Sequence, residues 1–154
     1  MRKSLSYPLL LGLVFLIVGT TGVTSTRASD TPDESPGEKI KRRIEKKQED
    51  CVEKDSSTVG MRTCAEAAYV EWDREMNVAY KALMKELPVE GQNALREAQR
   101  EWIKYRDKEF EAIDGVYSQM EGTMWIPIRI ESRVRVVRER VLMLRHYLEI
   151  LSER

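Results

Sequence analysis

Few side chains in this sequence could do chemistry: two cysteines, one histidine and many carboxylates. His146 has no Ser or Cys nucleophile at a readable spacing, and it falls near the C-terminal end of a predicted helix. At such a position an imidazolium balances the helix dipole or faces solvent, and we interpret His146 in this way. One histidine and two cysteines are too few for the usual four-ligand structural zinc site. The sequence therefore predicts no metal and no other cofactor.

Asp73 and Asp107 are the acids that most resemble a catalytic pair, because each belongs to a segment that should form a helix packed against the other. Paired carboxylates carry out glycoside hydrolysis. With 26 acidic residues a chance pair is expected, so we interpret these two as partner contacts or members of interhelical ion pairs. The sequence also lacks the glycine-rich loops that bind nucleotide phosphates. The chain is therefore not predicted to be an enzyme.

Length and composition restrict the class of protein. A chain of 154 residues suffices for one domain, and 42% hydrophobic with 34% charged residues is typical of a soluble, helix-rich protein. Basic and acidic side chains are equal in number, at 26 each, which argues against a nucleic-acid partner.

Residues 1–28 are typical of a secretory signal peptide. They begin with the basic run Met1-Arg2-Lys3, continue with an almost unbroken apolar run over 9–18, and allow cleavage after Ala28. An uncleaved membrane anchor is the alternative, because the uncharged stretch is near the ~20 residues that span a bilayer. Cleavage removes three of the 26 basic side chains and none of the 26 acidic ones, which leaves a net charge of −3. We expect a periplasmic or secreted protein that meets a membrane only if this segment stays attached.

Export changes the interpretation of the two cysteines. In an oxidising compartment Cys51 and Cys64 should form a disulfide. Closing a loop of about 14 residues stabilises a fold by roughly 3 kcal/mol in the chain-entropy model. A free redox pair is the alternative, but it usually has CxxC spacing, whereas these cysteines are 13 positions apart.

The mature chain divides into a linker and one helical domain. Residues 29–38 carry two prolines, a glycine and four acids, which predicts a disordered linker before a domain at 39–154. Residues 39–53 predict a short or fraying helix, and apolar residues then recur every three or four positions over 61–87, 95–113 and 130–151. The pattern predicts an all-α fold, a small antiparallel three-helix (up-down-up) bundle with a short disulfide-linked N-terminal helical segment.

Two polar segments could meet a partner. The basic run Lys41-Arg42-Arg43 is more typical of a solvated helix face than of a patch for an acidic partner. Residues 114–123 predict a connecting loop that contains Tyr117, Met120 and Glu121, and Thr123 is expected to cap the helix that follows. Tyr and Met are enriched at protein interfaces, so a binding surface is the alternative interpretation of this loop.

Two blocks of residues resemble a known family. The first is similar to the signature of the LprI-type lysozyme-inhibitor-like domain and consists of Asp50-Cys51, Thr58, Met61, Cys64, Trp72-Asp73, Glu75-Met76-Asn77, Tyr80 and Leu83. The second is similar to the family's L-R-x-A-Q-R-x-W-x-x-x-R-D stretch and consists of Leu95-Arg96, Ala98-Gln99-Arg100, Trp102 and Arg106-Asp107. Gly122-Thr123 then resembles the Gly-Thr before the family's last helix. The resemblance covers residues 50 to about 150.

The resemblance implies an exported helical domain of the bacterial envelope that inhibits a lysozyme through protein–protein contact. It implies structural roles for the signature residues Trp72, Asn77, Tyr80, Gln99, Trp102 and Arg106. Such domains often carry a further cysteine pair, whereas Phe110 stands in the first of those regions here and no cysteine follows Cys64.

For a cationic lysozyme as partner, the candidate contacts are Tyr117, Glu121, Asp73 and Asp107. We predict a monomer. The alternative is an envelope structural or interaction protein without lysozyme inhibition, which could use residues 41–47 on an anionic surface.

Overall fold

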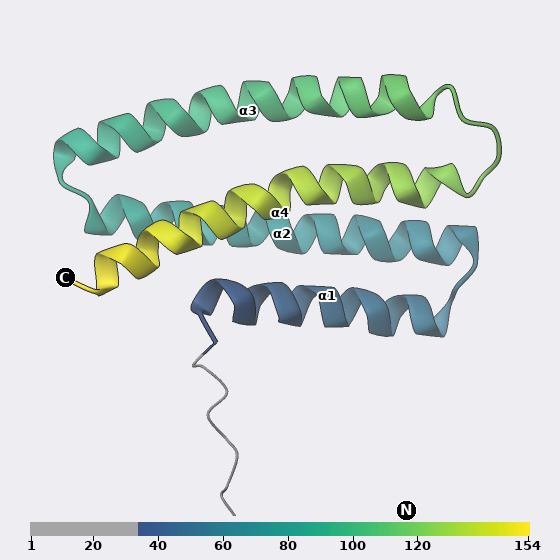
Figure 1. The fold of residues 1–154 in the computed structure, drawn as a ribbon, viewed down its shortest axis with the longest axis horizontal. Coiled ribbons are helices and arrows are strands. Elements are labelled where there is room, and N and C mark those ends of the chain that lie inside the picture. The colour runs from purple at the N-terminus through teal and green to yellow at the C-terminus, as the bar shows by residue number, and fades with distance from the viewer. Residues whose placement is uncertain (1–33) are drawn as a thin grey trace, which may run out of the picture. The chain divides into compact units, whose positions relative to one another are not determined.

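The computed structural model describes residues 34–154, and over this range the chain forms four α-helices and no strand. The helices are α1 (Pro36–Lys54), α2 (Thr58–Glu86), α3 (Val89–Tyr117) and α4 (Trp125–Ser152) (Figure 1). The predicted all-α class is confirmed, but the predicted three-helix bundle is wrong because there is a full fourth helix. None of the described helices combines the length and apolarity needed to cross a bilayer. The predicted signal peptide, and residues 29–33 of the predicted linker, lie outside the described residues.

Helix α1 has 19 residues and is therefore more than the short segment expected from its few apolar positions. It begins at Pro36, inside the predicted linker, where Ser35 Oγ accepts a hydrogen bond from the Glu38 amide at 3.2 Å. Proline favours the first helical position because its φ is already helical. The Gly37 amide also donates to Glu149 Oε1 of α4 at 3.1 Å. Contacts to another helix therefore set the start of α1.

Helix α2 begins and ends where side-chain chemistry predicts. Ser57 Oγ accepts from the Gly60 amide at 3.0 Å and caps the first turn. The helix ends at Glu86, because Leu87 precedes a proline and adopts an extended conformation with ψ 144°. Pro88 then leads directly into α3, so the connection between these two helices is short.

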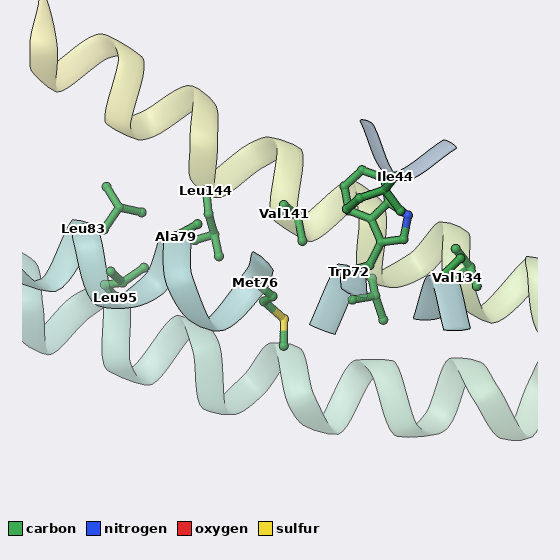
Figure 2. Close-up of a cluster of buried hydrophobic side chains, with 11 residues drawn as sticks. Ile44, Trp72, Met76, Ala79, Leu83, Leu95, Val134, Val141 and Leu144 are labelled. Carbon is green, nitrogen blue, oxygen red and sulfur yellow. The ribbon is translucent and has the colours of Figure 1, made fainter. Parts of the chain in front are cut away.

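The hydrophobic core lies mainly between α2 and α4, which run in the same direction (Figure 1). Helix α1 packs against both of them, α3 packs against both of them, and α1 and α3 make no contact within the described chain. The core consists of Ile44, Ala68, Trp72, Met76, Ala79, Leu83, Leu95, Val134, Val137, Val141 and Leu144 (Figure 2). Each large apolar side chain in it contributes about 1.5–3 kcal/mol by leaving water.

Helix α3 contributes little to this core. Of its 29 residues only Leu95 and Gln99 are buried. A helix with so small an apolar contact needs other interactions to hold it in place, and these involve the signature residues described below.

The connection between α3 and α4 is shorter than the predicted loop. Helix α3 continues through Asp114 to Tyr117, so the turn consists of residues 118–124. Gly122 has a φ of +97°, a conformation that favours glycine. The expected cap at Thr123 is wrong: α4 has no side-chain cap, and the Thr123 carbonyl accepts from the Ile126 amide at 3.1 Å.

Candidate partner-binding surface

The predicted disulfide is confirmed. Cys51 in the last turn of α1 is bonded to Cys64 in the second turn of α2, with their Cα atoms 5.8 Å apart. There is no free cysteine in the described chain. The bridge holds the hairpin of α1 and α2 at the end of the domain where the α3–α4 turn also lies (Figure 1).

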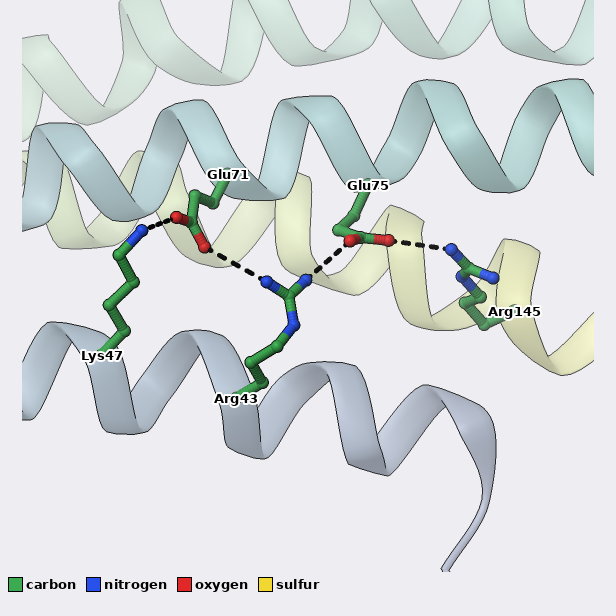
Figure 3. Close-up of polar contacts among 5 residues, drawn as sticks. All are labelled: Arg43, Lys47, Glu71, Glu75 and Arg145. Atoms are coloured by element: carbon green, nitrogen blue, oxygen red, sulfur yellow. Dashed lines mark hydrogen bonds and ion pairs between the residues drawn. The ribbon is translucent and has the colours of Figure 1, made fainter.

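An ionic network attaches α1 to the central helices (Figure 3). Arg43 Nη2 lies 2.7 Å from Glu75 Oε1, and Glu75 Oε2 lies 2.8 Å from Arg145 Nη2 of α4. Lys47 pairs with Glu71, whose other oxygen lies 3.6 Å from Arg43. The carboxylates of α2 thus join all three helices through cations.

The basic run Lys41-Arg42-Arg43 of α1 is also paired with acidic side chains. Lys41 pairs with Glu38 at 3.2 Å, and Arg42 pairs with Glu34 at 2.6 Å. Because Arg43 is held by the network, each basic side chain of this run has an acidic partner. The run therefore offers little free positive charge to an anionic surface.

Arginine and aromatic side chains alternate between α3 and α4 and form what we call the arginine–aromatic ladder. Its order is Arg140, Trp102, Arg106, Phe110 and Arg133. The guanidinium carbon lies 5.8 Å from the ring centroid for Arg140 on Trp102, 5.7 Å for Arg106 on Trp102, 5.9 Å for Arg106 on Phe110, and 5.2 Å for Arg133 on Phe110. Cation–π contacts contribute about 0.5–1 kcal/mol each where the cation is exposed and about 2 kcal/mol where it is desolvated, so the buried Arg140 should contribute most.

Gln99 completes the attachment of α3. Its side-chain oxygen accepts from Nε and Nη2 of Arg140 at 3.0 and 2.9 Å, and its amide donates to the sulfur of Met76 at 3.5 Å. Arg140 is only 7% exposed and has no acidic partner in the described chain. Burial lowers the pKa of Arg140 from its usual value.

The ladder explains why Gln99, Trp102 and Arg106 fall at spacings of three and four in the second signature block. Sequence reasoning missed their partners Arg133 and Arg140, which lie in a segment rich in arginine. The available signal was that Arg140 falls beside the apolar stripe of its helix.

Three other signature residues lie on α2, and one of them, Trp72, is buried in the core. Tyr80 lies partly buried against the core. Asn77 donates to the Asp73 carbonyl at 2.8 Å and to its carboxylate at 3.3 Å. Asn77 therefore orients Asp73 within α2 and does not reach another helix.

The structure brings Asp73 and Asp107 to the same aromatic side chain, Tyr69. Burial raises the pKa of Tyr69, and both acids act in the same direction, whereas Arg106 and Arg133 lower it. Asp107 accepts from Arg106 at 2.7 and 2.9 Å. A groove of about 380 Å³ lies beside these groups and is lined by Glu66, Tyr69, Val70, Phe110, Ile130 and Arg133.

Phe110 contacts the edge of Tyr69, with ring centroids 6.1 Å apart. An aromatic contact thus occupies the position in which the resemblance implies an additional cysteine.

The other two candidate contacts, Tyr117 and Glu121, lie near the α3–α4 turn but differ in their surroundings. Tyr117 belongs to α3, its hydroxyl hydrogen-bonds Ser132 Oγ at 2.9 Å, and its ring lies 6.1 Å from that of Trp125. Asp114 pairs with Arg133 one turn earlier. These contacts fix the base of the turn, while Glu121 is exposed and has no polar partner among residues 34–154.

Exposed apolar side chains occur before and after Glu121 in the sequence, within the turn and in the adjoining turns of α3 and α4. We call the group the turn patch, and it consists of Val116, Met120, Glu121, Met124 and Ile128. Val116 is 62% and Met124 54% exposed. Sequence reasoning named only Met120 and Glu121 of this group.

His146 lies on the surface, and its Nδ1 is 3.8 Å from Glu149 Oε2. Over residues 34–154 no three His, Cys, Asp or Glu side chains gather in a way that could hold a metal ion.

Comparison with known proteins places these features in context. The family model described as "Lysozyme inhibitor LprI" matches residues 50–144. A crystal structure of an uncharacterized protein from Burkholderia thailandensis is similar, with a TM-score of 0.66 and 30% identity over 71% of this chain and 55% of that chain. The chain thus spans about half the length of that protein. No curated protein matches.

Proposed function

Because the chain belongs to the LprI lysozyme-inhibitor family, we propose that it inhibits a lysozyme-like muramidase by binding to it. The family match over residues 50–144 is the observation that carries this proposal. The matched range includes the disulfide and the arginine–aromatic ladder. We further propose that the protein is exported, which agrees with the disulfide and with the predicted signal peptide.

We propose the turn patch as the docking surface. An interface needs apolar side chains that leave water on binding, and Met and aromatic residues are enriched at such surfaces. The base of the turn is held by Tyr117, Ser132 and Trp125, so little conformational freedom is lost when a partner binds. A turn of seven residues is short enough to enter the substrate cleft of a muramidase.

Charge would assist this docking if the muramidase is basic. Over residues 34–154 Glu121 has no ion-pair partner, and the Asp73 carboxylate accepts a hydrogen bond from Asn77 without forming an ion pair. Uncompensated acids speed the encounter with a cationic partner, and the effect falls with salt. Asp107 contributes less, because Arg106 already neutralises it.

The test is residual lysozyme activity on peptidoglycan, titrated with the oxidised, processed protein at low and physiological salt. We expect saturable inhibition that weakens as salt rises. Met124→Ser and Glu121→Gln should each weaken inhibition about tenfold, the size of effect seen at interface hot spots. Glu153→Gln, a matched change of an exposed acid at the far end of α4, should not.

Absence of inhibition against several muramidase types would overturn the proposal. The alternative would then stand, an envelope interaction protein without lysozyme inhibition. Equal inhibition by wild type and both turn variants would retain the function but exclude the turn patch.

A further inference from the structure

The C-terminal half of α4 carries an exposed stripe that none of the described helices covers. Its members are spaced by four, four, three and four positions; the first four lie on one side of the helix, and the last follows the end of the helix by two residues. We call it the α4 stripe, and it consists of Glu139, Met143, Tyr147, Ile150 and Arg154. Met143 is 42%, Tyr147 43% and Ile150 50% exposed.

An apolar groove adjoins the stripe. It has a volume of about 220 Å³ and is lined by Leu83, Leu87, Leu95, Tyr147, Ile150 and Leu151. The last turns of α4 lie away from the first turns of α3 (Figure 1), which leaves this side of α4 open. The groove and the stripe together form a surface that would gain stability by leaving water.

Opposite charges stand at the two ends of the stripe. Glu139 has no ion-pair partner in the part of the chain that the structure describes, and Arg154 donates only to the Leu151 carbonyl, at 3.3 Å. Glu139 and the last helical residue, Ser152, are separated by about 20 Å at 1.5 Å per residue, and Arg154 follows two residues later. A stripe with an acid at one end, a base at the other and apolar residues between them is complementary to itself in the antiparallel direction.

We propose that the α4 stripe is the interface of a two-fold symmetric homodimer in which two α4 helices pack antiparallel. Tyr147 lies next to the two-fold axis. Met143 of one protomer then packs against the partner's Ile150, and Glu139 pairs with the partner's Arg154. The symmetry repeats each contact, so the dimer gains two ion pairs.

The size of this surface predicts a weak dimer. Five stripe residues and the adjoining groove are fewer than the 20 to 30 residues a side of a standard interface. We therefore expect a dissociation constant of roughly 10 to 100 µM. The monomer predicted from the sequence would prevail only below this concentration.

This inference does not depend on the proposed function. The turn patch lies at the N-terminal end of α4 and includes Ile128 of its first turn, whereas the stripe begins at Glu139. A dimer formed through the stripe therefore leaves both turn patches free.

The test is sedimentation equilibrium of the oxidised, processed protein from about 1 to about 500 µM, a range that brackets the expected constant. Glu139→Arg and Arg154→Glu should each weaken dimerisation by about tenfold, because each creates two like-charged contacts. The double variant should restore it. Glu49→Arg, the same charge change on the exposed face of α1, should have no effect.

A cysteine near the axis supplies a second readout. Tyr147→Cys should give a disulfide-linked dimer on mild oxidation, whereas Glu49→Cys should not. All of these positions are exposed, so each variant should keep its helices, and circular dichroism is the control for this. A protein that stays monomeric over the whole range, or a dimer that neither single charge change weakens, would overturn the proposal.

Discussion

The guanidinium of Arg140 shares the side-chain oxygen of Gln99, which accepts from Nε at 3.0 Å and from Nη2 at 2.9 Å. No carboxylate of the described chain faces this buried cation, so an amide and the Trp102 ring take the place of a counter-ion. The pair joins α3 to α4 where α3 has almost no apolar contact of its own. Loss of the Arg140–Gln99 hydrogen bonds should therefore weaken the attachment of α3 to α4 more than the loss of two hydrogen bonds would elsewhere.

Gln99→Leu removes the only oxygen of residues 34–154 that accepts from buried Arg140. We expect the free energy of unfolding to fall by about 3 kcal/mol, because Nε and Nη2 of a buried cation lose their acceptor and only the Met143 sulfur, 3.7 Å from Nη1, remains. Arg140→Met removes the charge itself and should cost less, and the double variant should be more stable than Gln99→Leu alone. Urea unfolding of the three variants checks this order, and equal losses in both single variants would contradict it.

Gly60 and Gly115 should respond in opposite directions to alanine. A Cβ on Gly60 would lie 2.3 Å from the Asp55 carbonyl oxygen, whereas one on Gly115 meets nothing within 4 Å. Gly60→Ala should destabilise the protein by more than about 2 kcal/mol through forced movement of backbone. Gly115→Ala in α3 should stabilise it by about 0.5–1 kcal/mol. Thermal unfolding of both variants decides, and a neutral Gly60→Ala would show that the α1–α2 turn is not fixed by this contact.

Removing the disulfide by a double change of Cys51 and Cys64 to Ser should cost about 3 kcal/mol, since it frees a loop of about 14 residues in the unfolded chain. The ionic network of Arg43, Glu75 and Arg145 should still hold α1 in place at low salt. Urea unfolding with and without reductant provides the control. Reductant should destabilise the wild type to the level of the variant and leave the variant unchanged.

Asp55 should make stability depend on acid pH. The hydroxyl and the amide of Ser57 bind its carboxylate and hold the pKa of Asp55 below its usual value of 3.8. The stabilisation is therefore fully present above the unfolded pKa and is lost as pH falls through the lower, folded value. Asp55→Asn should be less stable than wild type at neutral pH. The difference in urea midpoint should vanish well below pH 3.8, and a constant difference down to that pH range would exclude this role.

Local patterns predicted most of the fold but not its helix count. The stripes in α2 and α4 are apolar every three or four positions, and both helices formed as predicted. Helix α1 buries only one large apolar side chain fully, that of Ile44. Its stability comes from ion pairs with Glu71 and Glu75 and from the disulfide. Ion-pair and disulfide partners that lie on another helix do not produce an apolar repeat in the sequence of α1, so the sequence pattern could not predict its length.

The sequence likewise predicted some features of the candidate partner contacts, whereas others depend on neighbouring helices. Exposure of Glu121 agrees with its place in a polar, glycine-containing segment. Tyr117 was expected in a loop, but Ser132 and Trp125 of the next helix hold it at the end of α3. Asp73 and Asp107 were expected on packed helices, and the structure adds Tyr69 as the side chain that both approach.

The sequence by itself determined the helical class, the approximate helix limits, the disulfide and the family, because each follows from residue types at short, fixed spacings. Only the tertiary structure decided that Arg140 and Arg133 complete the ladder with Trp102 and Phe110. Only the tertiary structure, too, decided that the last turns of α4 leave an apolar stripe uncovered. Contacts between residues on different helices, here 23 or more positions apart, depend on how whole helices pack and diverge, and the order of residues within one helix does not contain that information.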